Sequence, residues 1–184
     1  MFPNLKWDYR REWKKCGPRG KIHSFLIIIL QQGFYAVMNY RMCRWLVQKK
    51  IPLLHIFIQK CSETFTGISI PPTAEIGKGL LIEHFGGIVV NSGAKIGEFC
   101  TISHGVTVGS KVPGGGSPTI GNNVYLCAGA KVLGEISVGD NSIIGANCVL
   151  MKSVPANSVV VGIPGRVVKE IKDLKEYREF YYED

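Results

Sequence analysis

Two histidines, His84 and His104, are the residues of this sequence best suited to chemistry. His84 follows Glu83 and precedes the pair Gly86-Gly87, so the backbone beside it can open towards a ligand. Imidazole titrates near neutral pH, which makes histidine an efficient general base. A base of this kind suits a hydroxyl that attacks an activated carbonyl. We therefore predict a catalytic role for His84 and an active-site role for His104.

Attack of a hydroxyl on a carbonyl creates an oxyanion, which needs hydrogen-bond donors. Backbone N–H groups around Gly86-Gly87 or at the Gly109 turn are candidates for this role. The sequence contains neither the GxSxG pattern of acyl-enzyme hydrolases nor a phosphate-binding GxxxxGK[ST] loop. The other histidines, His23 and His55, have no catalytic partners near them in the sequence and are interpreted as structural. An acyl-enzyme hydrolase and an NTPase are therefore both disfavoured.

The segment that must position His84 is a repeat of six residues. An aliphatic residue recurs at every sixth position in two registers, and glycine follows many of these positions. This period fits neither a helix nor an alternating strand, but it fits a solenoid whose inward side chains stack from coil to coil. We therefore predict a mainly β fold, a parallel β-helix over residues 67–165. The registers are Ile70, Ile76, Ile82, Val90, Ile96, Ile102 and Val108, then Ile120, Leu126, Val132, Val138, Ile144 and Leu150.

Two interruptions of the repeat mark the expected site. The spacing from Ile82 to Val90 is eight instead of six, so two extra residues bulge beside His84. One coil of eighteen residues plus this bulge separates His84 from His104, which allows the two side chains to share a face. The Gly- and Pro-rich segment 110–118 must leave the solenoid as a loop.

The N-terminal third differs from the solenoid in charge. The first 60 residues hold 12 Lys and Arg against two acidic residues, whereas the remainder holds ten against twelve. We predict a basic helical segment over 1–66, with helices over about 22–49 and 53–66, that caps the first coil or joins subunits. An alternative interpretation places this segment on an anionic membrane surface. A nucleic-acid partner is not expected, because no recognised module accompanies the charge. A C-terminal tail over 166–184 is predicted to be helical.

Six cysteines show no metal-ligand spacing, and Cys100 and Cys148 occupy small inward positions of the repeat. We interpret them as reduced core residues of a cytoplasmic protein and expect no metal site. The apolar run at 25–30 is too short for a membrane span, and no signal cleavage site follows it.

Several stretches together resemble a known family: LLIEHFGGIVV, ISHGVTVG, AGAKVLGEISVG and VGIPGRVV. They are similar to the hexapeptide-repeat, left-handed β-helix acyltransferases, within which the serine acetyltransferase branch is closest. The resemblance covers about residues 68–168. It implies a left-handed coil, homotrimers that can pair into dimers of trimers, active sites between subunits, acetyl-CoA as donor, and direct transfer without a covalent enzyme intermediate.

The resemblance also implies roles for single residues. His84 matches the catalytic base of the family, and Gly109 begins the loop near the thioester. Ala128 and Ala146 match alanines whose backbone lines the groove for the pantetheine arm of CoA. At the end of the solenoid, Lys152 and Arg166 are expected to meet the nucleotide part of CoA.

Departures from the serine acetyltransferase pattern concern the acceptor. In the family, an Asp orients the catalytic His, and the corresponding residue here is Ser69. A loop His of the family helps to bind serine; it corresponds to Ser117 here, and the Arg beside it is also missing. An Asp used for the amino group of serine is Glu83. Serine is a zwitterion, and its binding site must match both charges. The loss of the Arg and His therefore argues against serine as the acceptor. Glu83, Ser69 or a backbone carbonyl is expected to hold His84.

ISHGVTVG after EHFGG is closer to serine-acetyltransferase-like proteins of exopolysaccharide and capsule clusters, including the colanic acid type. The main prediction is therefore an acetyl-CoA-dependent O-acetyltransferase that acts on a sugar of a surface polysaccharide or its precursor. One alternative is an L-serine O-acetyltransferase of cysteine biosynthesis. A second alternative is a non-catalytic β-helix scaffold.

Overall fold

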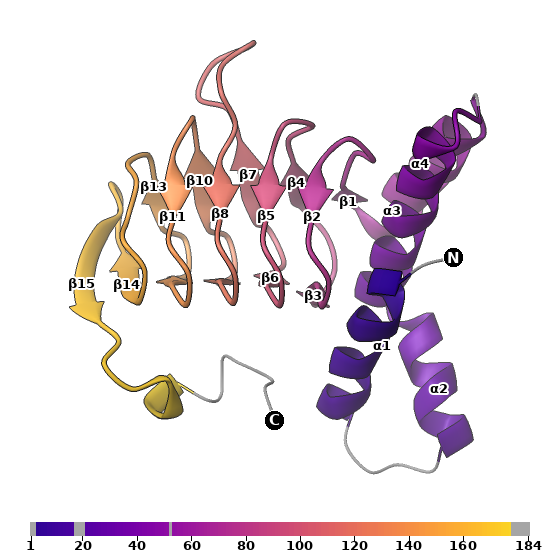
Figure 1. Ribbon diagram of the computed structural model, residues 1–184, viewed down its shortest axis with the longest axis horizontal. Coiled ribbons are helices and arrows are strands. Elements are labelled where there is room, and N and C mark those ends of the chain that lie inside the picture. Colours follow the sequence, from indigo (N-terminus) through magenta and orange to yellow (C-terminus); the bar gives the residue numbers. More distant parts are fainter. Residues whose placement is uncertain (1–2, 17–20, 52, 178–184) are drawn as a thin grey trace.

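The protein is a parallel β-solenoid with helices across its first coil and an added strand at its last (Figure 1). The computed structural model describes residues 3–16, 21–51 and 53–177. The predicted fold class, mainly β with N-terminal helices, is confirmed.

Four helices precede the solenoid: α1 (Pro3–Cys16), α2 (Lys21–Leu30), α3 (Gln32–Gln48) and α4 (Leu54–Thr66). The single helix expected over about 22–49 is divided at Gln31, whose backbone is extended with φ −66° and ψ 121°. The helix expected over 53–66 corresponds to α4. α1 was not anticipated, since its basic and aromatic residues show no clear apolar stripe.

The solenoid strands form three sheets. Sheet A contains β1 (Ile68–Ser69), β4 (Ile88–Val90), β7 (Thr107–Gly109), β10 (Lys131–Leu133) and β13 (Val149–Leu150). Sheet B contains β2 (Glu75–Ile76), β5 (Lys95–Ile96), β8 (Thr119–Ile120) and β11 (Ser137–Val138). Sheet C contains β3 (Leu81–Glu83), β6 (Thr101–Ser103), β9 (Tyr125–Leu126), β12 (Ile143–Ile144), β14 (Ser158–Val161) and β15 (Arg166–Glu170).

The strand registers confirm both interruptions of the repeat. Tyr125 pairs with Ile143, which gives a regular coil of 18 residues. Leu81 pairs with Thr101, so the coil that contains His84 has two extra residues. Thr101 pairs with Tyr125, so the next coil holds six more, and they form the tall loop after β7 in Figure 1.

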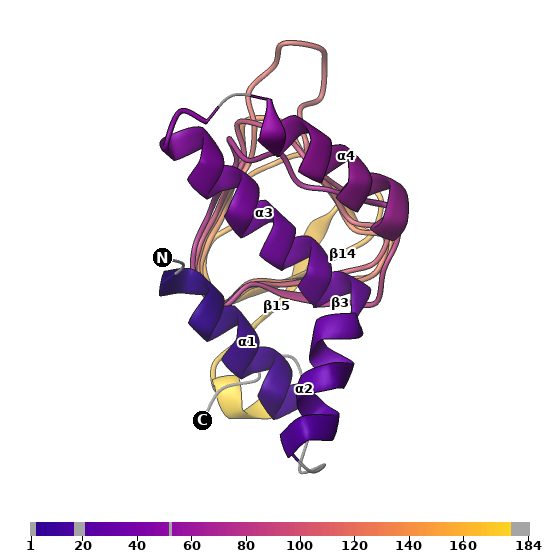
Figure 2. The same ribbon diagram turned by 90° about the vertical axis from the view of Figure 1, so that its right-hand side faces the viewer.

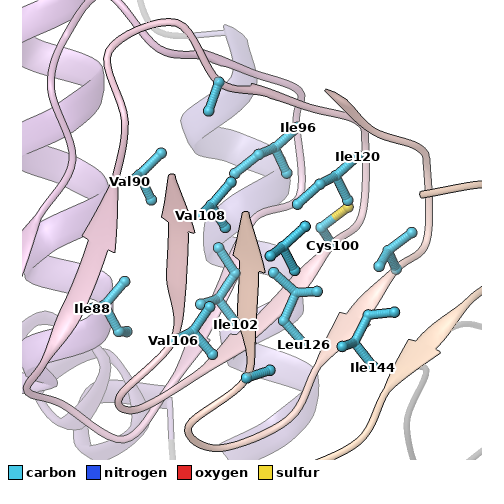
Figure 3. Packing of buried hydrophobic residues seen from close by; sticks show 14 of the residues in the cluster. Ile88, Val90, Ile96, Cys100, Ile102, Val106, Val108, Ile120, Leu126 and Ile144 are labelled. Atoms are coloured by element: carbon cyan, nitrogen blue, oxygen red, sulfur yellow. The ribbon is translucent and has the colours of Figure 1, made fainter. Parts of the chain in front are cut away.

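All thirteen aliphatic residues of the two predicted registers are buried in one continuous core. Figure 3 shows members of successive coils, such as Ile102, Leu126 and Ile144, stacked inside the solenoid. Cys100 and Cys148 are also buried there, as predicted. Solenoid strands of two or three residues form few hydrogen bonds each. The stack of coils therefore depends mainly on the apolar area that each coil buries.

Helices α1, α3 and α4 lie across the open end of the solenoid (Figure 2), and basic side chains of α1 and α3 contact the first coil. Arg11 donates to the carbonyl oxygens of Gly79 at 2.7 Å and Cys100 at 3.0 Å. Arg41 donates to Asp8 at 2.9 Å and to the Ile76 carbonyl at 2.8 Å. These contacts give partners to carbonyls of the first coil, those of Ile76 and Gly79, whereas the Cys100 carbonyl also accepts the Leu81 N–H at 3.0 Å. The predicted capping role therefore has a structural basis.

Further donors complete this cap. Arg44 donates to the carbonyls of Pro72 at 3.0 Å and Ala74 at 2.7 Å, and the Tyr40 hydroxyl also donates to Ala74, at 2.7 Å. The guanidinium groups used in this way face the solenoid and not a lipid surface. Among the described residues, no helix has the length and apolarity needed to cross a membrane.

The prediction of a helix directly from 166 onwards is wrong. Arg166–Glu170 forms strand β15, antiparallel to β14, and only Leu174–Tyr177 forms a short 3₁₀ helix. Pro164-Gly165 reverses the chain, and the β-branched Val167 and Val168 favour pairing with the exposed edge of the last strand. The remainder of the predicted tail, 178–184, lies outside the described residues.

Candidate active site

The turns that join sheet C to sheet A stack in a column along one edge of the solenoid, here called the C–A edge. The Gly129 N–H donates to the His104 carbonyl at 2.9 Å, and the Asn147 N–H donates to the Ala128 carbonyl at 2.9 Å. The C–A edge therefore carries His84, His104, Ala128 and Ala146 on four successive coils. Two predicted catalytic-site residues and the two predicted CoA-groove alanines share this edge.

His84 lies in the bulged turn directly after β3. Its backbone φ is +62°, an uncommon conformation for a residue with a side chain. The imidazole is exposed and contacts that of His104 edge to face, with ring centroids 5.6 Å apart and planes at 80°. The predicted proximity of the two histidines is confirmed. Gly87 is needed in the same turn, because a Cβ there would lie 3.3 Å from the Gly105 Cα and its φ is +66°.

Glu83, at the end of β3, is held by a residue two coils away. The Tyr125 hydroxyl donates a short hydrogen bond to Glu83 Oε2, and the Ser103 hydroxyl donates to the Tyr125 oxygen at 3.4 Å. Burial, together with the neighbouring Glu83 carboxylate, raises the pKa of Tyr125. The phenol thus keeps its proton and acts as the donor, which fixes the direction of the carboxylate beside His84.

A second carboxylate, Glu12 of α1, lies close enough to Glu83 to feel its charge. The Glu12 side chain is buried, and its Oε2 atom has no hydrogen-bond partner. Burial raises the pKa of Glu12 to about 7, with Glu83 adding to the increase and Lys15 and Arg11 opposing it. Glu83, with the partly ionised Glu12 near it, favours the binding of a cation in this region.

The raised pKa of Glu12 predicts a pH-dependent cost in stability. Its pKa is 4.5 for an ordinary Glu and about 7 when folded, so stability is lost as the pH rises through this interval. We expect Glu12→Gln to raise the free energy of unfolding by about 3 kcal/mol at pH 8 and by about 1 kcal/mol at pH 5.5. Urea unfolding at both pH values measures this. The exposed Glu75→Gln should show neither effect, and equal gains at both pH values would contradict the assignment.

A cavity of about 350 Å³ opens beside His84, between the helices and the first coil. It is here called the His84 cavity. The first turn of α3 forms one wall, since Gly33 lies directly on β3, where a Cβ would come within 2.5 Å of the Ile82 carbonyl oxygen. Its other lining residues are Lys15, Gln31, Gln32 and Phe85. A small molecule in this cavity meets both the solenoid and the N-terminal helices.

Ser69 and Ser117 make local contacts away from His84. The Ser69 hydroxyl donates to Glu63 Oε1 at 2.8 Å, and the Ser117 hydroxyl donates to Asn91 Oδ1 at 2.9 Å. Asn91 follows β4, whereas His84 precedes it, so β4 separates Ser117 from the imidazole within one chain. Ser69 is thus paired with Glu63, and Glu83 Oε2 accepts the hydrogen bond of Tyr125.

The remaining predicted CoA residues lie near the loop and the last coil. Gly109 ends β7 and begins the 110–118 loop. Arg166 begins β15, and the turn before it follows β14, so it lies at the far end of the C–A edge. Lys152 is exposed after β13, on the next corner of the coil. The structure therefore aligns Arg166 with the alanines but does not bring Lys152 to the same edge.

Sequence reasoning missed three residues near His84: Lys15, Glu12 and Tyr125. Two of them lie on α1, which was not anticipated as a helix. Tyr125 occupies an outward position of the repeat, where its hydroxyl could reach several neighbours. The one signal for these residues in the sequence was Glu12, an acidic residue among the basic residues of α1. It does not indicate which residue Glu12 contacts.

Comparisons with known proteins agree with this geometry. Residues 117–152 match the family described as bacterial transferase hexapeptide (six repeats). A serine acetyltransferase from Mycobacterium tuberculosis is 42% identical over 172 residues, covering 91% of this chain and 73% of the relative.

Solved structures show the same similarity. Serine acetyltransferase from Brucella abortus, in complex with coenzyme A, superposes with a TM-score of 0.83 at 32% identity, covering 91% of this chain and 67% of that one. Serine acetyltransferase from Neisseria gonorrhoeae, in complex with serine, gives 0.80 at 31% identity, covering 90% and 67%. The predicted acyltransferase class and hexapeptide fold are confirmed.

These relatives also correct the predicted acceptor, because they are named as acting on serine and not on a polysaccharide. The argument against serine considered only residues of the solenoid and its loop, such as Ser117. It overlooked α1, which brings Lys15 and Glu12 to the region of His84. The main prediction of a sugar acceptor is therefore wrong. The chain belongs to the serine acetyltransferase family, a family of acetyl-CoA-dependent hexapeptide-repeat acyltransferases.

Proposed function

We propose that this protein is an L-serine O-acetyltransferase that uses acetyl-CoA as donor. The observation that carries the proposal is an exposed histidine next to a fixed carboxylate, at the mouth of a cavity large enough for an amino acid. Relatives 38–44% identical to this chain are serine acetyltransferases, which supports the same acceptor.

His84 acts as the general base in this proposal. It takes the proton of the serine hydroxyl as the oxygen attacks the thioester carbonyl. When the carbon–sulfur bond breaks, the protonated imidazole returns this proton to the departing CoA sulfur. Backbone N–H groups of the Gly86-Gly87 turn are the proposed donors to the oxyanion.

The carboxylates near His84 support an acceptor that carries an ammonium group. Glu83 is ordered by Tyr125, and Glu12 adds negative charge behind it. A neutral sugar hydroxyl offers no cation to balance these groups, whereas the amino group of serine does. We propose that Glu83 binds this amino group directly.

The C–A edge is the proposed binding surface for CoA. Ala128 and Ala146 present small side chains there, on the two coils beyond His104, so a thin pantetheine arm can lie flat against the backbone. Gly109 is proposed to flank the thioester, with Lys152 and Arg166 near the nucleotide. In a homotrimer, the 110–118 loop of a neighbouring subunit would bring Ser117 towards this edge.

The domain limits follow the same proposal. We propose that the described residues of 1–66 form the cap that completes the acceptor site, that residues 67–165 carry the base and the CoA edge, and that residues 166–177 close the last coil.

The test is CoA release from acetyl-CoA by the full chain with and without L-serine, read with a thiol reagent. We expect release to increase strongly on addition of L-serine, and mass spectrometry to find O-acetyl-L-serine. Release that L-serine does not stimulate, with acetyl-CoA bound, would contradict the proposed function.

Tyr125 is expected to act as a positioning residue through Glu83. Tyr125→Phe removes only the hydroxyl, and one hydrogen bond to a carboxylate contributes about 1–2 kcal/mol. We expect the KM for L-serine to rise about 5- to 30-fold while kcat and the KM for acetyl-CoA change little. Steady-state kinetics measures this split, and Tyr35→Phe, whose ring packs on Phe65, is the matched control. An unchanged KM for serine would contradict the role.

A further inference from the structure

Among the described residues, Lys15 of α1 is the one lysine in the wall of the His84 cavity. Lys15 is half-buried, three residues after Glu12 on the same helix. Within the described part of the chain, no carboxylate comes within ion-pair distance of its ammonium group. Its charge lowers the pKa of Glu12, and it lines the same cavity as His84. Lys15 therefore places an unpaired positive charge beside the cavity.

Gln31, at the start of α3, forms another part of the cavity wall. Gln31 lines the cavity, and its buried Oε1 atom accepts no hydrogen bond. It is the N-cap residue of α3, and no side chain caps that helix. Gln32 and Gly33, the first residues of this 17-residue helix, continue the wall. Uncapped N–H groups and the helix dipole add to the positive potential that Lys15 creates.

The two charged side chains that matter here, Glu83 and Lys15, come from different elements. Glu83 projects from the solenoid, next to the imidazole in the chain, and Lys15 projects from α1 into the cavity. An acceptor whose hydroxyl reaches His84 can place an ammonium at Glu83 and an anion at Lys15. The matching ligand is a hydroxy amino acid with a free carboxylate.

We propose that Lys15 binds the carboxylate of the acceptor, and that it replaces in this role the cationic loop residues that are absent around Ser117. The inference rests on the proposed function and specifies its acceptor: a free amino acid, not an ester, an amide or a peptide-bound serine. Recognition by α1 also explains how the N-terminal helices belong to the active site and do not serve only as a cap.

The test compares Lys15→Gln with Lys14→Gln, an exposed neighbour on the same helix. A charge-assisted hydrogen bond lost on substitution is expected to raise the KM for L-serine about 10- to 100-fold. The kcat and the KM for acetyl-CoA should change by less than about threefold, and Lys14→Gln should match the wild type. Lys15→Arg keeps the charge and should recover most of the affinity.

L-serine methyl ester separates charge recognition from a structural effect, because it keeps the hydroxyl and ammonium but lacks the carboxylate charge. We expect Lys15→Gln to change kcat/KM for the ester by less than about threefold. Equal losses with serine and ester, or a KM for serine like that of Lys14→Gln, would overturn the inference. A wild type that releases no CoA with L-serine overturns the proposed function itself, so the two failures are distinguishable.

Discussion

Replacing His84 by alanine is expected to lower kcat for L-serine-dependent CoA release by about 10²- to 10⁴-fold. The exposed imidazole lies at the C–A edge and also lines the His84 cavity. General-base catalysis contributes a factor of this size. Because the side chain is exposed, its removal leaves no cavity in the core, and the melting temperature should change little.

The control for this prediction is His23→Ala, an exposed histidine on α2. Its kcat should equal that of the wild type. His84→Asn, which keeps polarity but provides no base at neutral pH, should be as inactive as the alanine variant. A His84→Ala protein that retains more than a tenth of wild-type kcat would show that another group removes the proton.

Arg41→Ala is expected to lower the free energy of unfolding by about 3–5 kcal/mol, the usual cost of leaving a buried charge unpaired. Arg41 and Asp8 are both buried, with 2.9 Å between Arg41 Nε and Asp8 Oδ2. Asp8 also accepts the Leu80 N–H at 2.8 Å, so this pair joins α1 and α3 to the first coil. Burial raises the pKa of Asp8 despite Arg41, and without the arginine the carboxylate would lose its main compensation.

Urea unfolding followed by circular dichroism measures this loss. Arg10→Ala is the matched control, since Arg10 is an exposed arginine of α1 that contacts the Trp7 ring. We expect it to change stability by less than about 1 kcal/mol. Equal effects of the two substitutions would contradict the view that buried basic residues hold the cap on the solenoid.

The solenoid could be predicted because its signal is local. Each inward residue, such as Ile96 or Ile120, follows directly from the period of six and needs no knowledge of distant contacts. The bulge beside His84 could be predicted in the same way, because two extra residues disturb that period. The proximity of His84 and His104 followed from counting residues per coil, and the edge-to-face contact confirms it.

The acceptor side of the site could not be predicted in the same way. Lys15 and Glu12 reach the region of His84 only because α1 packs across the first coil, and Arg11 fixes this packing through carbonyls 68 and 89 residues away. Tyr125 reaches Glu83 across 42 residues. No sequence period encodes such contacts, so a charge balance drawn from the solenoid alone selected the wrong acceptor.

The error at the C-terminus has a related cause. The composition of the charged segment after the last coil favours a helix. In the structure, however, Val167 and Val168 belong to strand β15, which pairs with β14. Pairing with an open sheet edge outweighed the local helical preference of the charged residues around them.

A competition between acceptors tests the central claim most directly. The wild-type protein is given acetyl-CoA with equimolar L-serine and a mixture of free hexoses and nucleotide sugars, and the acetylated products are quantified by mass spectrometry. Product ratios then report the ratio of kcat/KM values. O-acetyl-L-serine as the dominant product is the predicted result. An acetylated sugar in excess would contradict the account of the site, from Lys15 to Glu83.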